Sequence, residues 1–193
     1  MIKKLTLLIP LLLVIGGCSN EVTYDQLVER GGLTYKINSQ TPFTGSFVDY
    51  HENGQLKGKG SYKDGKSEGL LQEYFVNGQL MHNTNFKDGE FHGPHQSYYA
   101  NGLFDYKGNY KEGERDGLYE EYHENGKLKH RANYKDGNQE GPWVYYYRNG
   151  QLENKGNFKD GKRHGLHERY TENGHTMYKS NYKDGLEIPL NSD

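Results

Sequence analysis

The chain has 193 residues, of which only 32% are hydrophobic, 18 are tyrosine and 26 are glycine. So few aliphatic side chains exclude a deep two-layer core. A formal net charge of −2 does not indicate the basic surface that nucleic-acid binding requires. Disorder is disfavoured because disordered segments are poor in aromatic residues.

Residues 1–17 have the features of a secretory signal. Lys3 and Lys4 precede an apolar run of about 11 residues that starts at Leu5, too short for a comfortable membrane span. We therefore expect this segment to be a lipoprotein signal peptide that is removed from the mature chain.

The apolar run ends at Ile15-Gly16-Gly17-Cys18, and Cys18 is the only cysteine in the chain. This ending resembles the lipobox of bacterial lipoproteins. The resemblance implies cleavage before Cys18, diacylation of its sulfur and acylation of its new amine with chains such as palmitate. Two or three acyl chains give stable membrane anchoring. The expected location is the bacterial cell envelope, and Ser19 in place of aspartate favours the outer membrane if the source is Gram-negative.

The rest of the chain divides by its repeat pattern. Residues 18–33 contain no repeat and are expected to form a lipid-anchored tether, and residues 34–43 an irregular N-terminal cap. Terminal repeats need such atypical neighbours to close their exposed edge. Residues 44–185 hold six 24-residue repeats, and residues 186–193 form a C-terminal tail.

Two turn signals define each repeat, as the segment 122–141 (YHENGKLKHRANYKDGNQEG) shows. Asn125-Gly126 and Asp136-Gly137 are dipeptides that supply the positive φ angles of tight hairpin turns. The Asn-Gly pairs begin at residues 53, 77, 101, 125, 149 and 173, and the Asp-Gly or Glu-Gly pairs at 64, 88, 112, 136, 160 and 184. The constant spacing predicts a repeat protein built from β-hairpins.

An aromatic residue also recurs every twelve positions, so that each half of a repeat carries one ring. The series is Tyr50, Tyr62, Tyr74, Phe86, Tyr98, Tyr110, Tyr122, Tyr134, Tyr146, Phe158, Tyr170 and Tyr182. Strand alternation places Tyr62 on the same face as Gly60, whose equivalents in the other repeats are Thr84, Gly108, Ala132, Gly156 and Ser180. We expect rings to cover these small residues. The predicted fold class is all-β: an elongated, single-layer antiparallel β-meander of about twelve strands without a deep core.

The repeats resemble a known family. The segment 156–165 (GNFKDGKRHG) is similar to the MORN repeat (membrane occupation and recognition nexus). The pattern Tyr-x-Glu-Asn-Gly-x-Leu followed by Gly-Asn-Tyr-Lys-Asp-Gly resembles its bacterial variant, found in proteins labelled YwqK-type antitoxins. The resemblance covers about residues 42–185. It implies a structural repeat, with no catalytic residue to carry over.

Two His-x-x-His pairs, His92 with His95 and His164 with His167, raise the question of a metal site. Positions three apart on a strand face opposite ways, and no fixed cysteine or carboxylate set completes a coordination shell. The acids of the turns are expected to serve the turns themselves. We therefore expect no metal and no cofactor.

No catalytic set stands out. Serines are few, and glutamates such as Glu120 and Glu121 are interpreted as a solvated strand face. The prediction is that the protein is not an enzyme.

Aromatic residues outside the twelve-residue series are the candidate partner-binding residues. Trp143, Tyr145 and Tyr147 alternate along one face, and related places in other repeats hold Tyr119, Tyr99 and Phe75. Exposed aromatic patches often mark interaction sites. The alternative is that both faces of a coiled sheet are partly buried, so that these rings serve packing.

These observations predict a non-enzymatic, lipid-anchored repeat protein. It would bind another protein, a toxin or an envelope protein, in an antitoxin or immunity-like role. A surface adhesin or glycan-binding module and an envelope scaffold are the alternatives.

Overall fold

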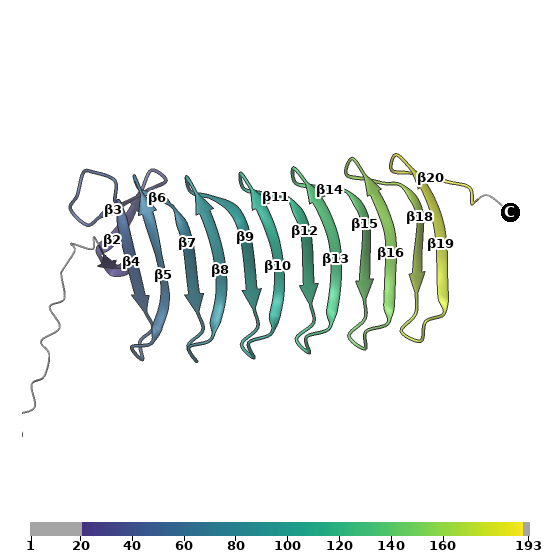
Figure 1. Ribbon diagram of the computed structural model, residues 1–193, viewed down its shortest axis with the longest axis horizontal. Helices are drawn as coiled ribbons and strands as arrows, with labels where there is room; N and C mark the ends of the chain where they lie inside the picture. The colour runs from purple at the N-terminus through teal and green to yellow at the C-terminus, as the bar shows by residue number, and fades with distance from the viewer. Residues whose placement is uncertain (1–20, 191–193) are drawn as a thin grey trace, which may run out of the picture.

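The computed structural model describes residues 21–190, and it confirms the all-β prediction. Antiparallel hairpins follow one another in chain order and form one long, open sheet (Figure 1). The predicted signal peptide and Cys18 lie outside the described residues. Within residues 21–190, no helix is long and apolar enough to cross a membrane.

Each repeat supplies one eight-residue strand and one strand before the Asn-Gly turn, which we call the shorter strand because it has six residues in five of the six repeats. The shorter strands are β4 (Gly45–Tyr50), β7 (Gly69–Tyr74), β9 (Glu90–Tyr98), β12 (Gly117–Tyr122), β15 (Gly141–Tyr146) and β18 (Gly165–Tyr170), of which β9 is the exception with nine residues. The eight-residue strands are β5 (Leu56–Lys63), β8 (Leu80–Lys87), β10 (Phe104–Lys111), β13 (Leu128–Lys135), β16 (Leu152–Lys159) and β19 (Thr176–Lys183). Short strands after the Asp-Gly or Glu-Gly turns are β6 (Lys66–Ser67), β11 (Glu114–Arg115), β14 (Asn138–Gln139), β17 (Lys162–Arg163) and β20 (Leu186–Ile188).

The Asp-Gly and Glu-Gly turns, along the upper edge in Figure 1, have the predicted geometry. In the representative pair, Asp136 has a φ of 46° and Gly137 a φ of 76°, as a two-residue type I′ hairpin requires. The glycine N–H of each such turn donates to a carbonyl of the preceding repeat, as Gly137 does to Arg115 at 3.0 Å. These turns therefore also join neighbouring repeats.

The Asn-Gly turns, along the lower edge, differ from the prediction. Only the glycine of each pair has a positive φ, such as 80° at Gly126. The N–H of Gly126 donates to the carbonyl of His123, and the N–H of His123 donates to Lys127. This is a three-residue loop, in which a type I turn is followed by a left-handed residue, so asparagine needs no positive φ.

The asparagines of these loops link one repeat to the next instead. In the first five of the six loops the asparagine side-chain N–H donates to a loop carbonyl 23 residues further along, as Asn101 does to Glu124 at 2.9 Å. The other pairs are Asn53 with Val76, Asn77 with Ala100, Asn125 with Arg148 and Asn149 with Glu172. Because every bond has the same offset, contacts between repeats are uniform along this edge.

The N-terminal segment packs on the first repeat. β1 (Val22–Thr23) pairs in parallel with β4, the 3-10 helix η1 (Tyr24–Gln26) follows, and β2 (Leu27–Arg30) and β3 (Leu33–Lys36) form a separate hairpin. Two strands and a 3-10 helix thus lie within residues 22–30, which are part of the predicted tether 18–33.

The small apolar core lies at this end of the sheet. It consists of Val22, Phe43 and Phe47, which are at most 8% exposed. At the other end, β20 pairs with β19, so the predicted tail 186–193 begins with a strand.

Candidate functional site

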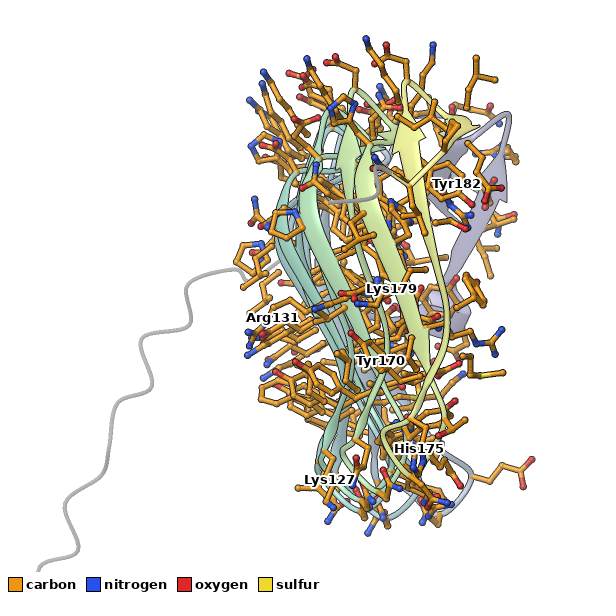
Figure 2. The ribbon with its side chains drawn as sticks, turned by 90° about the vertical axis from the view of Figure 1, so that its right-hand side faces the viewer. Lys127, Arg131, Tyr170, His175, Lys179 and Tyr182 are labelled. Atoms are coloured by element: carbon orange, nitrogen blue, oxygen red, sulfur yellow. The ribbon has the colours of Figure 1, made fainter. Side chains whose placement is uncertain are left out.

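The two sides of the sheet differ in chemistry. The aromatic face carries Phe47, Tyr119 and Trp143, which share one parity on the shorter strands, and the charged face carries Glu120 and, on the neighbouring strand, Arg131. The twelve-residue ring series divides between the two faces. Tyr134 packs edge-on against Tyr119, whereas the hydroxyl of Tyr122 donates to Glu120. Figure 2, seen from the C-terminal end, shows Arg131 and Tyr182 on opposite sides.

On the aromatic face, one row alternates large and small side chains, which confirms that rings cover small residues. The cross-strand pairs are Phe47 with Gly60, Leu71 with Thr84, His95 with Gly108, Tyr119 with Ala132, Trp143 with Gly156, and His167 with Ser180. Phe47 and Tyr119 lie so close that a Cβ on Gly60 or Gly108 would stand 3.0 Å from a ring atom. The residues that cover these small side chains stand at the positions equivalent to Phe47 in each repeat, and they are not members of the twelve-residue ring series.

Beside this row runs a second one, which we call the central row. Its cross-strand neighbours are, in order, Asp49, Gly58, Glu73, His82, Ser97, Tyr106, Glu121, His130, Tyr145, Asn154, Arg169 and Tyr178. Rings stack both within the central row and between the two rows. His130 and Tyr145 have centroids 4.0 Å apart and planes 12° apart, and Tyr106 stacks on His95 at 5.2 Å.

Three of the four histidines in these rows are buried, namely His95, His130 and His167. His95 is 7% exposed, and its ring nitrogens lie 3.0 Å from the Thr84 hydroxyl and 2.6 Å from the Tyr106 hydroxyl. Burial, with smaller effects of the charges on His82 and Arg115, lowers the pKa of His95 to about 4. Burial also lowers the pKa of His130 and His167.

Acidification is therefore expected to weaken the fold before any buried carboxylate titrates. His95 takes up a proton more readily in the unfolded chain, so the free energy of unfolding falls as pH drops from 6.5 toward 4. The loss is on the order of 2 kcal/mol. Denaturant melts at a series of pH values between about 7.5 and 4.5 measure it.

The control for this experiment is His95→Leu. Leucine is the residue at the equivalent position of the preceding repeat, Leu71. The variant leaves two hydroxyls without a partner and is less stable throughout, but its stability changes less with pH. An unchanged slope would rule His95 out as the titrating group.

The charged face holds two ion clusters. Glu120 is 4% exposed and accepts from Lys107 at 2.8 Å, from Arg131 at 2.8 Å and from the Tyr122 hydroxyl at 2.9 Å. Glu168 lies likewise between lysines of the flanking strands. The prediction of a solvated face was therefore wrong for Glu120, because cations from both neighbouring strands cover its carboxylate.

The structure separates the predicted partner-binding residues into two groups. Trp143, Tyr145 and Tyr119 all lie on the aromatic face, where Trp143 and Tyr145 meet edge-on at 5.6 Å and Tyr119 is 7% exposed. The others lie in the Asn-Gly loops: Phe75, Tyr99 and Tyr147.

The two tyrosines of the second group join repeats. The hydroxyl of Tyr99 donates to the carbonyl of Tyr122, and that of Tyr147 to the carbonyl of Tyr170, both at 2.8 Å. Tyr147 is therefore not part of the surface that Trp143 and Tyr145 form.

A hollow of about 260 Å³ opens on the aromatic face of the last two repeats. Trp143 and Tyr145 on β15 form one wall, and Tyr178 and Tyr182 on β19 the other. Between the walls lie Asn154, His167 and Arg169, with Arg163 at the end nearer the Asp-Gly turns.

Sequence reasoning missed Asn154, Arg169 and Tyr178. Aligning the repeats would have exposed the signal, because the equivalents of Asn154 in the three preceding repeats are the ring residues His82, Tyr106 and His130. The row loses a ring at Asn154, and a space results.

Three of the four histidines in the His-x-x-His pairs have neighbours that account for their positions. His95 and His167 are buried in the aromatic face, and the Nδ1 of His164 lies 3.6 Å from the Asp184 carboxylate. Among residues 21–190, no group of three or more histidine, cysteine, aspartate or glutamate side chains is placed to hold a metal ion.

Four segments of the chain match the family described as MORN repeat variant: 43–64, 115–136, 139–160 and 163–184. Each spans a shorter strand, an Asn-Gly loop and an eight-residue strand. The stretch between residues 64 and 115 keeps the same strand order and turn spacing. No curated protein matches the chain. The chain is therefore a repeat protein, and four of its units match the MORN repeat variant.

Proposed function

We propose that the protein is a non-enzymatic, lipid-anchored component of the bacterial envelope that binds another protein, in an antitoxin or immunity-like role. The observation that carries the binding role is the aromatic-walled hollow in the open sheet. A single-layer sheet leaves both faces accessible along its length, which suits recognition of a macromolecule. Aromatic and arginine side chains, which line the hollow, are enriched at protein interfaces.

The anchor rests on Cys18 and the segment before it. We expect the wild-type protein to sediment with membranes and to incorporate a fatty-acid label, because acyl chains on this cysteine hold it there. In Cys18→Ser the label is lost, and the protein becomes soluble or remains as uncleaved precursor. Labelling of the variant at the wild-type level would refute the anchor.

The same membranes test the binding role. Chemical cross-linking of the anchored wild type is expected to give a discrete complex with one other protein, identified by mass spectrometry. A deletion strain grown beside toxin-producing siblings then tests the immunity-like role. Recovery of the monomer alone, together with normal survival of the deletion strain, would contradict the proposal.

A saccharide-binding role is the second candidate. It is favoured by the side chains of Trp143 and Tyr145 next to the amide of Asn154 in one hollow, since sugar rings stack on aromatic faces and hydrogen-bond with amides. A glycan array on wild type and Trp143→Ala distinguishes the two roles.

A further inference from the structure

We propose that the gap at Asn154 receives an aromatic side chain that lies next to a carboxylate in a segment of the protein partner. This inference rests on the proposed binding function and names the surface and the chemistry that the partner presents.

The repeats themselves show what fits this place. In the central row, His82, Tyr106 and His130 occupy the positions equivalent to Asn154. The ring of His130 stacks on Tyr145 with planes 12° apart. On the other side of Tyr145 the next residue of the central row is Asn154, which has no ring. An aromatic ring placed over the Asn154 side-chain amide would extend the stack of His130 and Tyr145 toward Tyr178.

A second gap in the same row supports this interpretation. Gly58 is equivalent to Asn154, and a hollow of about 230 Å³ opens beside it. Tyr24, from the N-terminal segment outside the repeats, lines this hollow and packs on Phe47 with centroids 5.4 Å apart. A ring from another segment thus lies at one gap of the central row.

The charge of the hollow determines what accompanies the ring. Arg169 lies directly opposite Asn154, where the equivalent residues in the other repeats include Glu73, Ser97 and Glu121. The Arg169 guanidinium is 3.5 Å from Glu153 and its side chain is 41% exposed, so it can bind a further carboxylate. Arg163, which is also exposed, lines the hollow as a second cation.

Trp143 is the only tryptophan in the chain and lines the hollow, so its fluorescence and indole N–H resonance report on this site alone. The probe is a blocked Asp-Phe-Asp tripeptide, which contains no tryptophan. We expect a saturable change at millimolar peptide, and binding at least about tenfold weaker for Asp-Ala-Asp and for Lys-Phe-Lys.

Two variants test the two parts of the inference. Asn154→His fills the gap with the ring found at His130 and is expected to abolish the response while leaving the thermal melt intact. Arg169→Gln removes the cation and is expected to weaken binding about tenfold. Arg148→Gln, in an exposed loop, removes an equal charge elsewhere and is expected to bind as wild type.

The outcomes distinguish a peptide site from a saccharide site and from no site. Saturation by glucuronate but not by Asp-Phe-Asp would overturn the inference in favour of an acidic saccharide, and an unaltered response in Asn154→His would place the peptide elsewhere. No response to any probe would refute the site. If Asn154→His still forms the cross-linked complex in membranes, the proposed function stands and only this site fails.

Discussion

Replacing Gly156 by alanine is expected to lower the free energy of unfolding by about 1–3 kcal/mol, the usual cost of forcing extra volume into a packed site. A Cβ at this position would lie 2.7 Å from Nδ1 of His167. The His167 ring has little room to retreat, because it is 5% exposed and contacts Trp143 and Tyr182 edge-on or tilted. Denaturant unfolding followed by tryptophan fluorescence measures the loss.

Gly58→Ala is the matched control. Gly58 also lies in an eight-residue strand and is turned toward the same face of the sheet. A Cβ there would be 3.6 and 3.9 Å from its nearest atoms, which is ordinary van der Waals contact. Stability should be unchanged or slightly higher, because alanine reduces the freedom of the unfolded chain. Equal losses at Gly156 and Gly58 would show that crowding against His167 is not the cause.

Glu120→Gln is expected to lower the free energy of unfolding at neutral pH by about 2 kcal/mol, since hydrogen bonds to a charged group contribute more than neutral ones. The amide keeps the shape of the side chain but loses the charge that binds Lys107 and Arg131. One of its two acceptor oxygens also becomes a donor.

The effect should depend on pH in a defined direction. Burial raises the pKa of Glu120, but hydrogen bonds from Lys107, Tyr122 and Arg131 outweigh it and hold the pKa at about 2. The folded-state pKa is thus below the unfolded value, so the charge stabilises the fold above about pH 4.5 and this contribution disappears as pH falls toward 2.

Wild type and Glu120→Gln should therefore converge in stability on acidification. Chemical denaturation at several pH values tests this, with Glu124→Gln in an exposed loop as the control that changes little at any pH. A difference between wild type and Glu120→Gln that is constant with pH would mean that the carboxylate charge contributes nothing.

The repeat pattern predicted the fold because its signals are local. An Asp-Gly pair such as Asp136-Gly137 determines a two-residue turn by itself, and the constant spacing then fixes where every strand begins and ends. The Asn-Gly turns were predicted with the wrong geometry because a three-residue loop places the left-handed φ on glycine alone, and the dipeptide does not reveal loop length.

The candidate site was predicted only in part. Trp143 and Tyr145 are recognisable from strand alternation, but Asn154 and Arg169 become their neighbours only through cross-strand register. That register includes a shift between Tyr145 and Tyr146, and a one-residue shift moves a side chain to the other face. Burial of Glu120 was unpredictable for the same reason, because its cations come from both adjacent strands.

The hydrogen bonds between successive Asn-Gly loops also allow the length of the array to change by whole repeats. Each repeat adds two strands, or roughly 10 Å along the sheet, and its loop makes the same contacts with the loop before and after it. Whole repeats could therefore be gained or lost between Phe47 and the hollow beside Trp143 without new contacts being needed. The distance from the N-terminal end of the sheet to the proposed binding surface would change in fixed steps.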